Sequence, residues 1–444
     1  MDHIDIPEAK TLPVIGDAYR LAFQDPLNYF QDLQEKHGEI IRFKLGPVEA
    51  ILVTSPDLVA QVAGRDVRTY KKGKNFTSTR LFLGEGIFVA EGQKWRVHRR
   101  MMNPKFTEKE AKLYADIVTK TTSDTVDRWL KNGNEPFAMD YDMGHLAMTV
   151  IIKSLFGPGI DKEEKYGNAV RTCLDFVMER GSNPFPLPMA LPIKSHQKFK
   201  DAKQLLEDFI YESIEKAKKN PHGRTLINDL LAAEDEESKV RLSEEEIKDQ
   251  VLTIFLAGHE TTALALSWGW YLLDQHPEIE RKIRQEIAEV LGDREPVADD
   301  IAKLKYTRKV AMEILRLYPP VGVYPRQSLI KQKLGPYVIE KDEHIMLAPY
   351  LTHRIAEYWP KPNVFDPERF DDAVYSKQHP FAYFPFGKGR RICMGQHFAM
   401  MELVLVIATT LQKVRLEVVT KKVTPKFVAT IRPSELKMKV EPLS

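Results

Sequence analysis

The segment FPFGKGRRICMG, residues 384–395, holds Cys393, one of only two cysteines in a chain of 444 residues. It also contains three glycines and three cations, Lys388, Arg390 and Arg391. The stretch that follows, QHFAMMELVLVIATTLQ, is rich in apolar residues and has no Pro or Gly, so it predicts a buried helix. Cys393 is therefore expected at or just before a helix N-terminus, where the helix dipole, the free N–H groups and the nearby cations favour a thiolate.

Several chemistries would use such a cysteine. A zinc site needs three or four ligands, and although His397 lies one helical turn further on, no second cysteine is near. The same histidine could activate the thiol as a nucleophile, and FGKGRR could form a phosphate nest. A thiolate could also be the protein ligand of a haem iron, where it favours O–O cleavage and glycines let the backbone approach the macrocycle. The other cysteine, Cys173, is predicted to be a buried structural residue.

The composition narrows the class of protein. A hydrophobic fraction of 43% with 29% charged residues is ordinary for a globular protein with a large core. The formal net charge of +2 gives no reason to expect a nucleic-acid partner. Two cysteines exclude a disulfide framework and fit a reducing cytoplasm, where we expect the protein to reside. The N-terminal sequence MDHIDIPEAKTLPVIGD has no apolar core segment, so we expect neither a signal peptide nor a transmembrane anchor.

One segment, VLTIFLAGHETTALALSWGWYLL at residues 251–273, has the length of a membrane-spanning helix. His259 and Glu260 lie in its middle, however, and an acidic residue there costs about 2.5–3.5 kcal/mol. Upstream, Ser243 and Glu246 form the pattern of a capping box, which starts a helix in water. We therefore predict a long helix buried at the centre of the protein.

The pattern along the chain predicts one mixed unit, mainly α-helical with small β-sheets. We find no repeat, low-complexity tract or linker, so a single domain over residues 1–444 is expected. The Pro-rich apolar segment NPFPLPMALPI, residues 183–193, is interpreted as a packed connector in preference to a lid. Strand patterns are expected in the β-rich part, about 1–70, 320–350 and 415–444, and helical patterns in the α-rich part, about 90–318 and 393–413.

Residues 384–395 resemble the haem-thiolate signature of the cytochrome P-450 superfamily, F-x-x-G-x-R-x-C-x-G. Three further motifs occur in the family's order, and together they cover about 95 to 395. LPVIGD, near the N-terminus, is similar to the family's proline hinge. The matching residues are Phe386, Gly389, Arg391, Cys393 and Gly395 in the signature, AGHETT (257–262) in the oxygen-activation helix, Glu313 and Arg316 of EILR with Arg369 of PERF, and Trp95 and Arg99 of WRVHR.

The resemblance implies a two-lobed fold with the long helix over a haem b (iron protoporphyrin IX). Cys393 would be the iron ligand, and Phe386 would shield the sulfur. His98 would either reach a propionate or only pack. The residues implied to contact the cofactor are Cys393, Trp95, Arg99, His98, Arg326, Phe386, Arg391 and Gly395.

The resemblance also implies roles around the reacting oxygen. Thr261 would hydrogen-bond the bound dioxygen, and Glu260 would deliver protons through water as a general acid. The presence of both residues favours a monooxygenase over the peroxide-driven and isomerase branches of the family. Glu313, Arg316 and Arg369 would form a structural ion-pair triad.

The substrate is expected to be a small hydrophobic molecule. Phe88 in FLGEGIF matches the family position that overhangs the haem, and with Ala257, Val321 and Val323 it would line an apolar pocket. A fatty acid or a terpenoid-like molecule is predicted, with a polycyclic or aromatic xenobiotic as the alternative.

Electrons are expected to come from NAD(P)H through a separate partner, because the chain has no Fe–S cysteine spacing and no Gly-rich dinucleotide fingerprint. A ferredoxin, a flavodoxin or a flavin reductase would dock on the cysteine side, and salt would weaken this contact. Two alternatives are a haem carrier or gas sensor without catalysis, and a phosphate-binding or cysteine-nucleophile enzyme without haem. The candidate basic contacts are Lys94, Arg100, Lys388 and Arg390.

Overall fold

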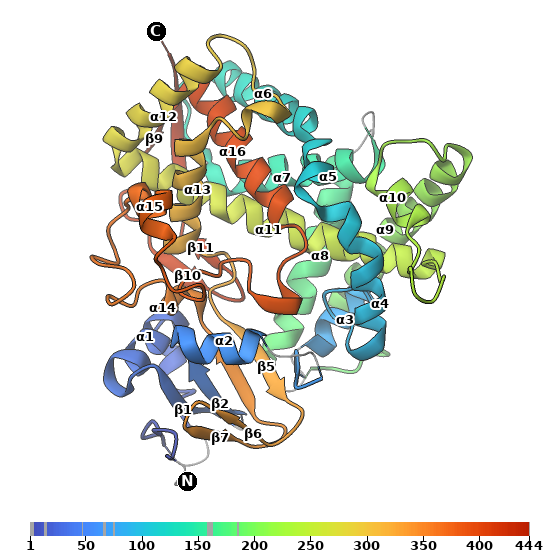
Figure 1. Ribbon diagram of the computed structural model, residues 1–444. Helices are drawn as coiled ribbons and strands as arrows, with labels where there is room; N and C mark the ends of the chain where they lie inside the picture. The colour runs from blue at the N-terminus through green and yellow to red at the C-terminus, as the bar shows by residue number, and fades with distance from the viewer. Residues whose placement is uncertain are drawn as a thin grey trace.

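A strand-rich part and a larger helical part make up the molecule (Figure 1). The computed structural model describes residues 4–12, 16–46, 48–64, 68–73, 76–157, 163–183 and 186–443. Residues 13–15 of the hinge-like LPVIGD, and residues 184–185 of the Pro-rich segment, lie outside these ranges. The fold class is confirmed as mainly α with small β-sheets.

The largest sheet joins segments that are far apart in the sequence. Its strand order is β1-β2-β8-β5-β3, and the β2–β8 pair is parallel whereas the other pairs are antiparallel. In Figure 1 the N-terminal strands lie beside strands from the region after residue 320. The strands are β1 (Ile40–Leu45), β2 (Val48–Val53), β8 (His344–Leu347), β5 (Tyr324–Ser328) and β3 (Tyr70–Lys71).

Three smaller sheets complete the strand content of the described residues. One has the order β4-β12-β9, and the other two are antiparallel pairs, β6 with β7 and β10 with β11. The β10–β11 hairpin lies against the central helix α11 (Glu244–Gln275). The strands are β4 (Phe137–Ala138), β6 (Gln332–Leu334), β7 (Tyr337–Ile339), β9 (Val414–Val418), β10 (Pro425–Phe427), β11 (Ile431–Pro433) and β12 (Lys437–Pro442).

Helices form the larger part. The segment up to residue 70, where strands were expected, also contains the helices α1 and α2. The helices besides α11 are α1 (Pro26–His37), α2 (Pro56–Gly64), α3 (Thr77–Leu83), α4 (Gly92–Met102), α5 (Glu108–Lys112), α6 (Ala115–Lys131), α7 (Met139–Phe156), α8 (Glu163–Ser182), α9 (Lys194–Lys219), α10 (Leu226–Ala232), α12 (Pro277–Val290), α13 (Lys305–Leu317), α14 (Pro349–Thr352), α15 (Asp372–Tyr375) and α16 (Gln396–Lys413).

The prediction of a long central helix is confirmed by α11. The Ser243 hydroxyl accepts a hydrogen bond from the Glu246 N–H, and the Glu246 carboxylate accepts one from the Ser243 N–H, so the predicted capping box is present. The helix packs against α7, α9, α13 and α16. Its burial among these helices explains why a hydrophobic segment of this length does not need a membrane.

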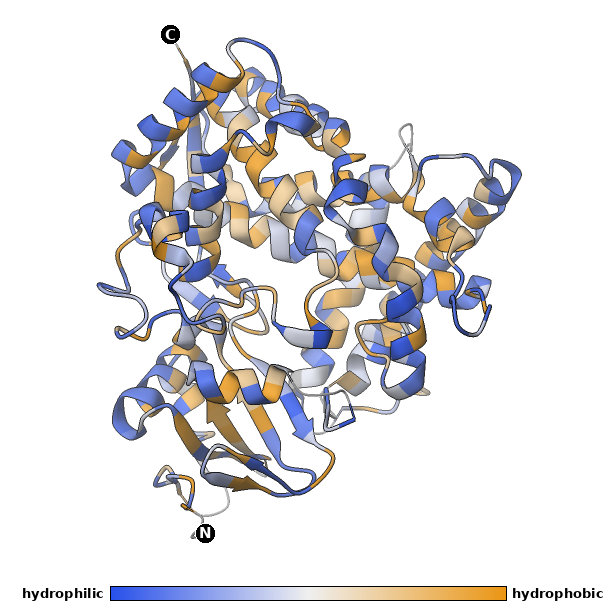
Figure 2. Ribbon diagram, viewed as in Figure 1, coloured by the Kyte–Doolittle hydropathy of each residue, from blue (hydrophilic) through white to orange (hydrophobic). Residues whose placement is uncertain are grey.

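The hydrophobic core runs through the helices around α11 and continues into α1, β1 and β2. Figure 2 shows hydrophobic residues concentrated in the interior helices and strands, and hydrophilic residues on the outward-facing parts of peripheral helices such as α12. Within the described ranges, no helix combines the length and the apolar character needed to cross a bilayer.

Candidate active site

The loop before α16 is a tight turn closed by its own backbone. The Cys393 N–H donates to the Phe386 carbonyl (2.8 Å), and Gly387 and Gly389 have φ values of +70° and +72°. A Cβ on Gly389 would lie 2.0 Å from the Ala63 carbonyl oxygen of α2, so only glycine fits there. The helix α16 begins directly after Gly395, which confirms that Cys393 lies just before a helix N-terminus.

The environment of the Cys393 thiol differs from the prediction of a free thiolate. Its side chain is exposed, yet desolvation by the surrounding protein raises the pKa of the thiol. The N–H of Gly395 and the charge of Arg99 act in the opposite direction but do not outweigh burial. The loop alone therefore does not ionise the sulfur, whereas coordination to a metal ion would.

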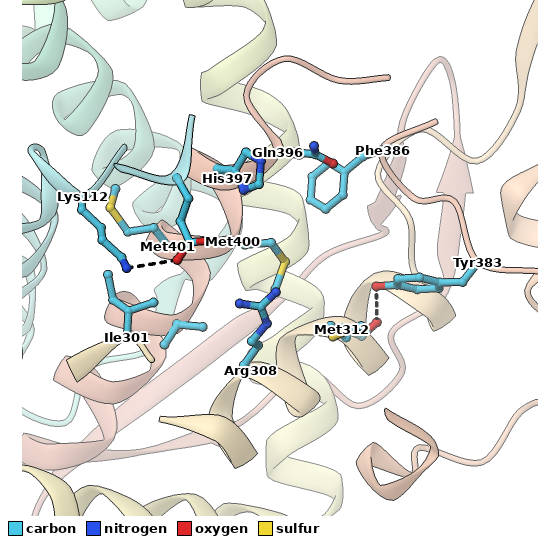
Figure 3. Close-up of a pocket in the computed structure, with 12 residues that line it drawn as sticks. Lys112, Ile301, Arg308, Met312, Tyr383, Phe386, Gln396, His397, Met400 and Met401 are labelled. Carbon is cyan, nitrogen blue, oxygen red and sulfur yellow. Dashed lines mark hydrogen bonds and ion pairs between the residues drawn. The ribbon is translucent and has the colours of Figure 1, made fainter. Parts of the chain in front are cut away.

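Two alternatives for the cysteine lose their geometric support. His397 lines a pocket of about 200 Å³ on the α5–α13 side of α16, together with Phe386 and Arg308 (Figure 3). It is not among the groups that shift the pKa of Cys393. No cluster of His, Cys, Asp and Glu side chains suited to a metal ion occurs within the part of the chain that the structure describes. A Cys–His nucleophile pair and a zinc site are therefore not supported.

Cations from α4 and the cysteine loop gather beside Cys393. The Arg391 guanidinium lies over the Trp95 ring, 4.9 Å from its centroid, and pairs with Glu91. Arg99 donates to the Ile392 carbonyl (2.8 Å) and lies close enough to Cys393 to interact with its charge. The two arginines that the WRVHR and FGKGRR motifs predicted are thus brought together on one side of the cysteine.

Two more cations belong to this group. Burial lowers the pKa of Arg326. The pKa of Lys72 is lowered well below its usual value, mainly by burial and to a smaller extent by repulsion from Arg391. Lys72 donates to the carbonyls of Ile87 and Ala90. No sequence motif pointed to Lys72, because within YKKGKN it resembles an ordinary solvated lysine.

The cation cluster provides a test of whether a haem fits. Among the residues that the structure describes, the four cations Lys72, Arg99, Arg326 and Arg391 have one carboxylate beside them, that of Glu91, which pairs with Arg391. Arg391 Nη1 is buried without a hydrogen-bond partner. Buried cations that lack counter-charges are costly. A ligand that carries two carboxylates would offset this cost, and the two propionates of a haem meet that need next to an accessible thiol. The residues present therefore fit the group.

His98 faces away from this cluster. Its Nε2 lies 3.3 Å from Glu246 Oε1 and its Nδ1 lies 3.1 Å from Gln250 Nε2, both on α11. Burial lowers the pKa of the ring, so the neutral form is favoured. Of the two roles expected for His98, the structure supports packing between α4 and α11 and not a propionate contact.

An accessible strip interrupts the burial of α11. Residues 247–255 and 262–270 are buried, whereas Ala257 is exposed and Glu260 and Thr261 are partly exposed. The Thr261 hydroxyl donates to the Ala257 carbonyl (2.7 Å), and the helix continues without a break through this motif.

The four residues expected in the substrate pocket differ in their accessibility. Phe88 is 42% exposed and packs edge-on against Phe76 at 5.3 Å. Ala257 is exposed and Val321 is partly exposed, whereas Val323 is buried. The exposed Phe88 and Ala257 side chains are therefore available for apolar contacts with a ligand.

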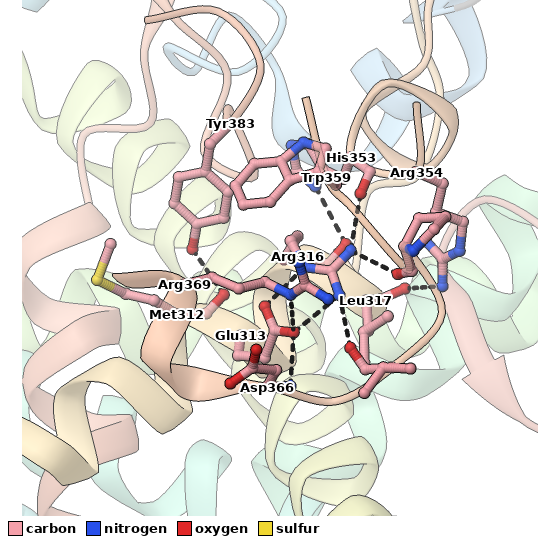
Figure 4. Close-up of polar contacts among 12 residues, drawn as sticks. Met312, Glu313, Arg316, Leu317, His353, Arg354, Trp359, Asp366, Arg369 and Tyr383 are labelled. Atoms are coloured by element: carbon pink, nitrogen blue, oxygen red, sulfur yellow. Dashed lines mark hydrogen bonds and ion pairs between the residues drawn. The ribbon is translucent and has the colours of Figure 1, made fainter. Parts of the chain in front are cut away.

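The predicted triad of Glu313, Arg316 and Arg369 is present, with Arg369 at its partly exposed end (Figure 4). Arg316 makes two hydrogen bonds to Glu313 (2.6 and 2.8 Å), and Arg369 Nε lies 3.4 Å from the same carboxylate. Both members of the EILR pair are fully buried. Arg316 also donates to the carbonyls of His353, Pro362 and Val364.

His353 connects this triad to the cysteine loop, a link that the sequence reasoning missed. Its Nδ1 lies 3.2 Å from the Arg316 carbonyl, and its Nε2 accepts a hydrogen bond from the Phe384 N–H (2.9 Å). Burial lowers the pKa of His353 well below its usual value, so the ring is neutral and can accept. The ion pair thus positions the first residue of FPFGKGRRICMG.

A second missed residue is Glu402, on the buried face of α16. Its side chain is fully buried, neither carboxyl oxygen has a hydrogen-bond partner that meets normal geometry, and burial raises its pKa to about 8. The nearby Thr262 hydroxyl, on α11, acts in the opposite direction. The sequence shows only a lone acid in an apolar helix.

Glu402→Gln is expected to stabilise the protein at neutral pH and not at acidic pH. The unfolded chain releases the proton above about pH 4.5 while the folded protein keeps it up to about pH 8, so this group lowers stability as pH rises between these values. At pH 7.5 the free energy of unfolding of the variant should exceed that of the unmodified protein by at most about 4 kcal/mol, whereas at pH 4.5 the two should be equal. Unfolding curves at both values, with the exposed Glu417→Gln as control, check this; an equal gain at both would contradict it.

The expected basic contacts for a redox partner are only partly free. Lys94 pairs with Glu246 (3.4 Å), and Arg100 pairs with Asp235 and Glu237 (both 2.8 Å), so their charges are offset within the chain. Lys388 is partly buried over Phe381, whereas Arg390 is exposed. Arg390 of the cysteine loop and Arg308, which lines the pocket of Figure 3, are both exposed and remain candidate contacts for an acidic partner.

Comparisons with known proteins agree with this geometry. The family model described as Cytochrome P450 matches residues 6–440. Cyclooctat-9-en-7-ol 5-monooxygenase of Streptomyces melanosporofaciens is 32% identical over 91% of this chain and 88% of that protein. Cytochrome P450 4V2 of Mus musculus is 30% identical over 91% of this chain and 83% of that protein.

Among solved structures, the P450DA heme domain superposes with a TM-score of 0.91, at 26% identity, over 99% of this chain and 98% of that one. The match extends over both the strand-rich and the helical parts. The cysteine loop, the cation cluster and the accessible strip of α11 thus lie within a fold that holds a haem in that protein.

Proposed function

This chain belongs to the cytochrome P450 family, and from that premise we propose which of its residues carry the reaction and which substrates it takes. It is a haem b-dependent monooxygenase that inserts one atom of dioxygen into an organic substrate, with electrons from NAD(P)H delivered through a redox partner. The main hydrophobic core joins the helices around α11 to α1, β1 and β2, and β1 and β2 also contribute to a second cluster beside it, which supports a single domain.

Cys393 is the proposed iron ligand, and the observation that carries this assignment is the group of partly buried, under-compensated cations beside an accessible thiol. Phe386 closes the turn that holds the cysteine, and Gly395 directs its N–H at the sulfur. When bound, the haem supplies the iron at which dioxygen is activated. The residues proposed to hold its propionates are Arg99, Arg326, Arg391, Trp95 and, in addition to those expected from the sequence, Lys72.

Thr261 and Glu260 are the proposed proton-handling residues. Because the Thr261 hydroxyl hydrogen is donated to the Ala257 carbonyl, the lone pairs of Oγ1 are free to accept a hydrogen bond on the accessible strip. Thr261 would therefore hold a water or a protonated oxygen in place, and Glu260, one residue before it, would exchange protons with that water.

Thr261→Ala is expected to lower the product formed per NAD(P)H by about tenfold and to release hydrogen peroxide instead, because the acceptor that fixes the proton-donating water is lost. Substrate binding should be retained. Product, NAD(P)H and peroxide are measured together. Thr261→Ser, which keeps the hydroxyl, is the control and should remain largely coupled; full coupling in Thr261→Ala would show that the hydroxyl has no part in proton delivery.

The proposed substrate is an aliphatic lipophilic molecule, a terpenoid-like alcohol first and a fatty acid second. The exposed Phe88 and Ala257 and the partly exposed Val321 offer apolar contacts and few polar groups. The name of one relative gives its substrate as cyclooctat-9-en-7-ol, a cyclic aliphatic alcohol.

Difference spectra of the ferric protein test this order of substrates. A cyclic terpenoid alcohol, a fatty acid of equal carbon number and a polycyclic aromatic are compared, and the terpenoid alcohol is expected to give the low-to-high spin shift at the lowest concentration. Phe88→Ala should change these dissociation constants, whereas the exposed Arg415→Gln, on β9, should not. Tightest binding of the aromatic compound would favour the xenobiotic alternative.

A further inference from the structure

The carboxylate of Glu260 is held by a part of the chain about which the sequence motifs say nothing. Its Oε1 accepts hydrogen bonds from Thr430 Oγ1 (2.8 Å) and Arg432 Nη2 (2.6 Å). Both donors belong to the β10–β11 hairpin and its turn, some 170 residues further along the chain. Both use the same oxygen, so among the described residues no side chain occupies Oε2.

The backbone between the two donors is anchored from two sides. The Ile431 carbonyl accepts a hydrogen bond from the Trp268 indole of α11 (3.0 Å), and the Ile431 N–H donates to the Pro320 carbonyl (2.9 Å). The Ile431 side chain is fully buried. On β11 the burial of Ile431 turns the next side chain, Arg432, to the other face, and Thr430, the last residue of the turn, also reaches Glu260.

Solvent exposure of the side chains rises from Thr430 through Glu260 to Arg432. Thr430 is 9% exposed, the Glu260 side chain 26% and the Arg432 side chain 47%. The carboxylate therefore lies between the buried core of α11 and a cation that reaches water. A surface ion pair that only added stability would not need a buried hydroxyl to share its oxygen, whereas two donors that converge on one oxygen fix the direction of the other.

We propose that Arg432 and Thr430 are positioning residues for proton delivery: they hold Oε1 of Glu260 so that Oε2 is presented to the water at Thr261, and Arg432 lies where protons enter from solvent. This inference rests on the proposed role of Glu260. It assigns a function in the reaction to the β10–β11 hairpin.

The first test compares Arg432→Gln, Thr430→Val and Glu260→Gln with the double variant Arg432→Gln/Glu260→Gln. Arg432→Gln should lower product per NAD(P)H severalfold and raise the solvent isotope effect on turnover, Thr430→Val should do so more weakly, and Arg432→Lys should restore coupling. In the Glu260→Gln background, Arg432→Gln should have no further effect. The exposed Arg415→Gln of β9 is the matched control.

Peroxide-driven turnover separates positioning from general damage. Hydrogen peroxide supplies the oxygen atom, the electrons and the protons (RH + H₂O₂ → ROH + H₂O), so the peroxide-driven rate of Arg432→Gln should equal that of the unmodified protein while its NAD(P)H-driven product falls. An equal loss by both routes would overturn the proposal.

Thermal unfolding of the ferric protein without substrate or electron donor gives a readout independent of activity. The shifts caused by Arg432→Gln and Glu260→Gln should be non-additive if the contact exists in solution, and strict additivity would overturn the inference. If Glu260→Gln left coupling and the isotope effect unchanged, the proposed role of Glu260 itself would fail. If Arg432→Gln alone left coupling and the isotope effect unchanged, the proposed role of Glu260 would be retained and the positioning role of Arg432 would be refuted.

Discussion

Cys393→Ser is expected to abolish monooxygenation and the spectral signature of thiolate ligation. Serine nearly matches cysteine in size, and the turn is closed by backbone groups, the Cys393 N–H and the Phe386 carbonyl, so the loop should keep its shape. The hydroxyl, however, is a far weaker electron donor than a thiolate. Electron donation by the thiolate is what favours O–O cleavage. Turnover should fall by about three orders of magnitude or more, equivalent to about 4 kcal/mol of activation free energy.

The measurement is the absorption spectrum of the reduced, carbon monoxide-bound protein, together with product formation. The red-shifted band typical of thiolate ligation should disappear in Cys393→Ser. Cys173→Ser is the matched control, because Cys173 is fully buried and its Sγ lies 4.0 Å from the Phe199 carbonyl, remote from any cation of the site. The control should keep the band and lose about 1 kcal/mol of stability. A red-shifted band that survived in Cys393→Ser would refute the ligand assignment.

Features encoded over a few consecutive residues could be predicted from the sequence. The capping box at Ser243 and the helix that follows it, the helix after the cysteine and the EILR ion pair all depend on contacts within one or two helical turns. The cysteine loop is of the same kind, because its glycines and its closing hydrogen bond lie within ten residues.

Contacts between distant segments could not be predicted in the same way. Arg391 repels the charge of Lys72, and Arg432 contacts Glu260, only because the tertiary fold brings their segments together. For His98 the sequence left two roles open, a propionate contact or packing, because only the tertiary fold brings the ring to Glu246 and Gln250 of α11. The ionisation of Cys393 also depends on burial, which the local cations alone did not reveal.

Arg316→Met is expected to prevent stable incorporation of haem. The arginine is fully buried, and its loss leaves the Glu313 carboxylate in the core with Arg369 at 3.4 Å as its remaining cation. Stranding one partner of a buried ion pair costs about 3–5 kcal/mol, which is a large part of the 5–15 kcal/mol that stabilises a typical protein. The recovered protein should have a low haem-to-protein ratio and a markedly lower melting temperature.

The effect should reach the cysteine loop through named contacts. Arg316 donates to the carbonyls of His353, Pro362 and Val364, and His353 accepts from the Phe384 N–H at the start of the loop. Where some haem is retained, the carbon monoxide complex should therefore show a mixed spectrum, because the turn that holds Cys393 is less well fixed. Arg281→Met, an exposed arginine on α12, is the control and should behave like the unmodified protein.

A double variant distinguishes stranded charge from lost hydrogen bonds. If the cost of Arg316→Met arises mainly from the unpaired Glu313, then Glu313→Leu/Arg316→Met should be more stable than the single variant, because replacing both partners of a buried pair by apolar residues is often neutral. If the three carbonyls that Arg316 serves dominate, the double variant should be no better, since they stay unsatisfied in both. In that case the arginine's main task is to organise the segment that leads to the cysteine, and the carboxylate serves to keep the arginine in place. Either result shows whether the ion pair or the three carbonyl contacts of Arg316 contribute more to this part of the site. Normal haem content and stability in Arg316→Met would instead show that the triad is dispensable.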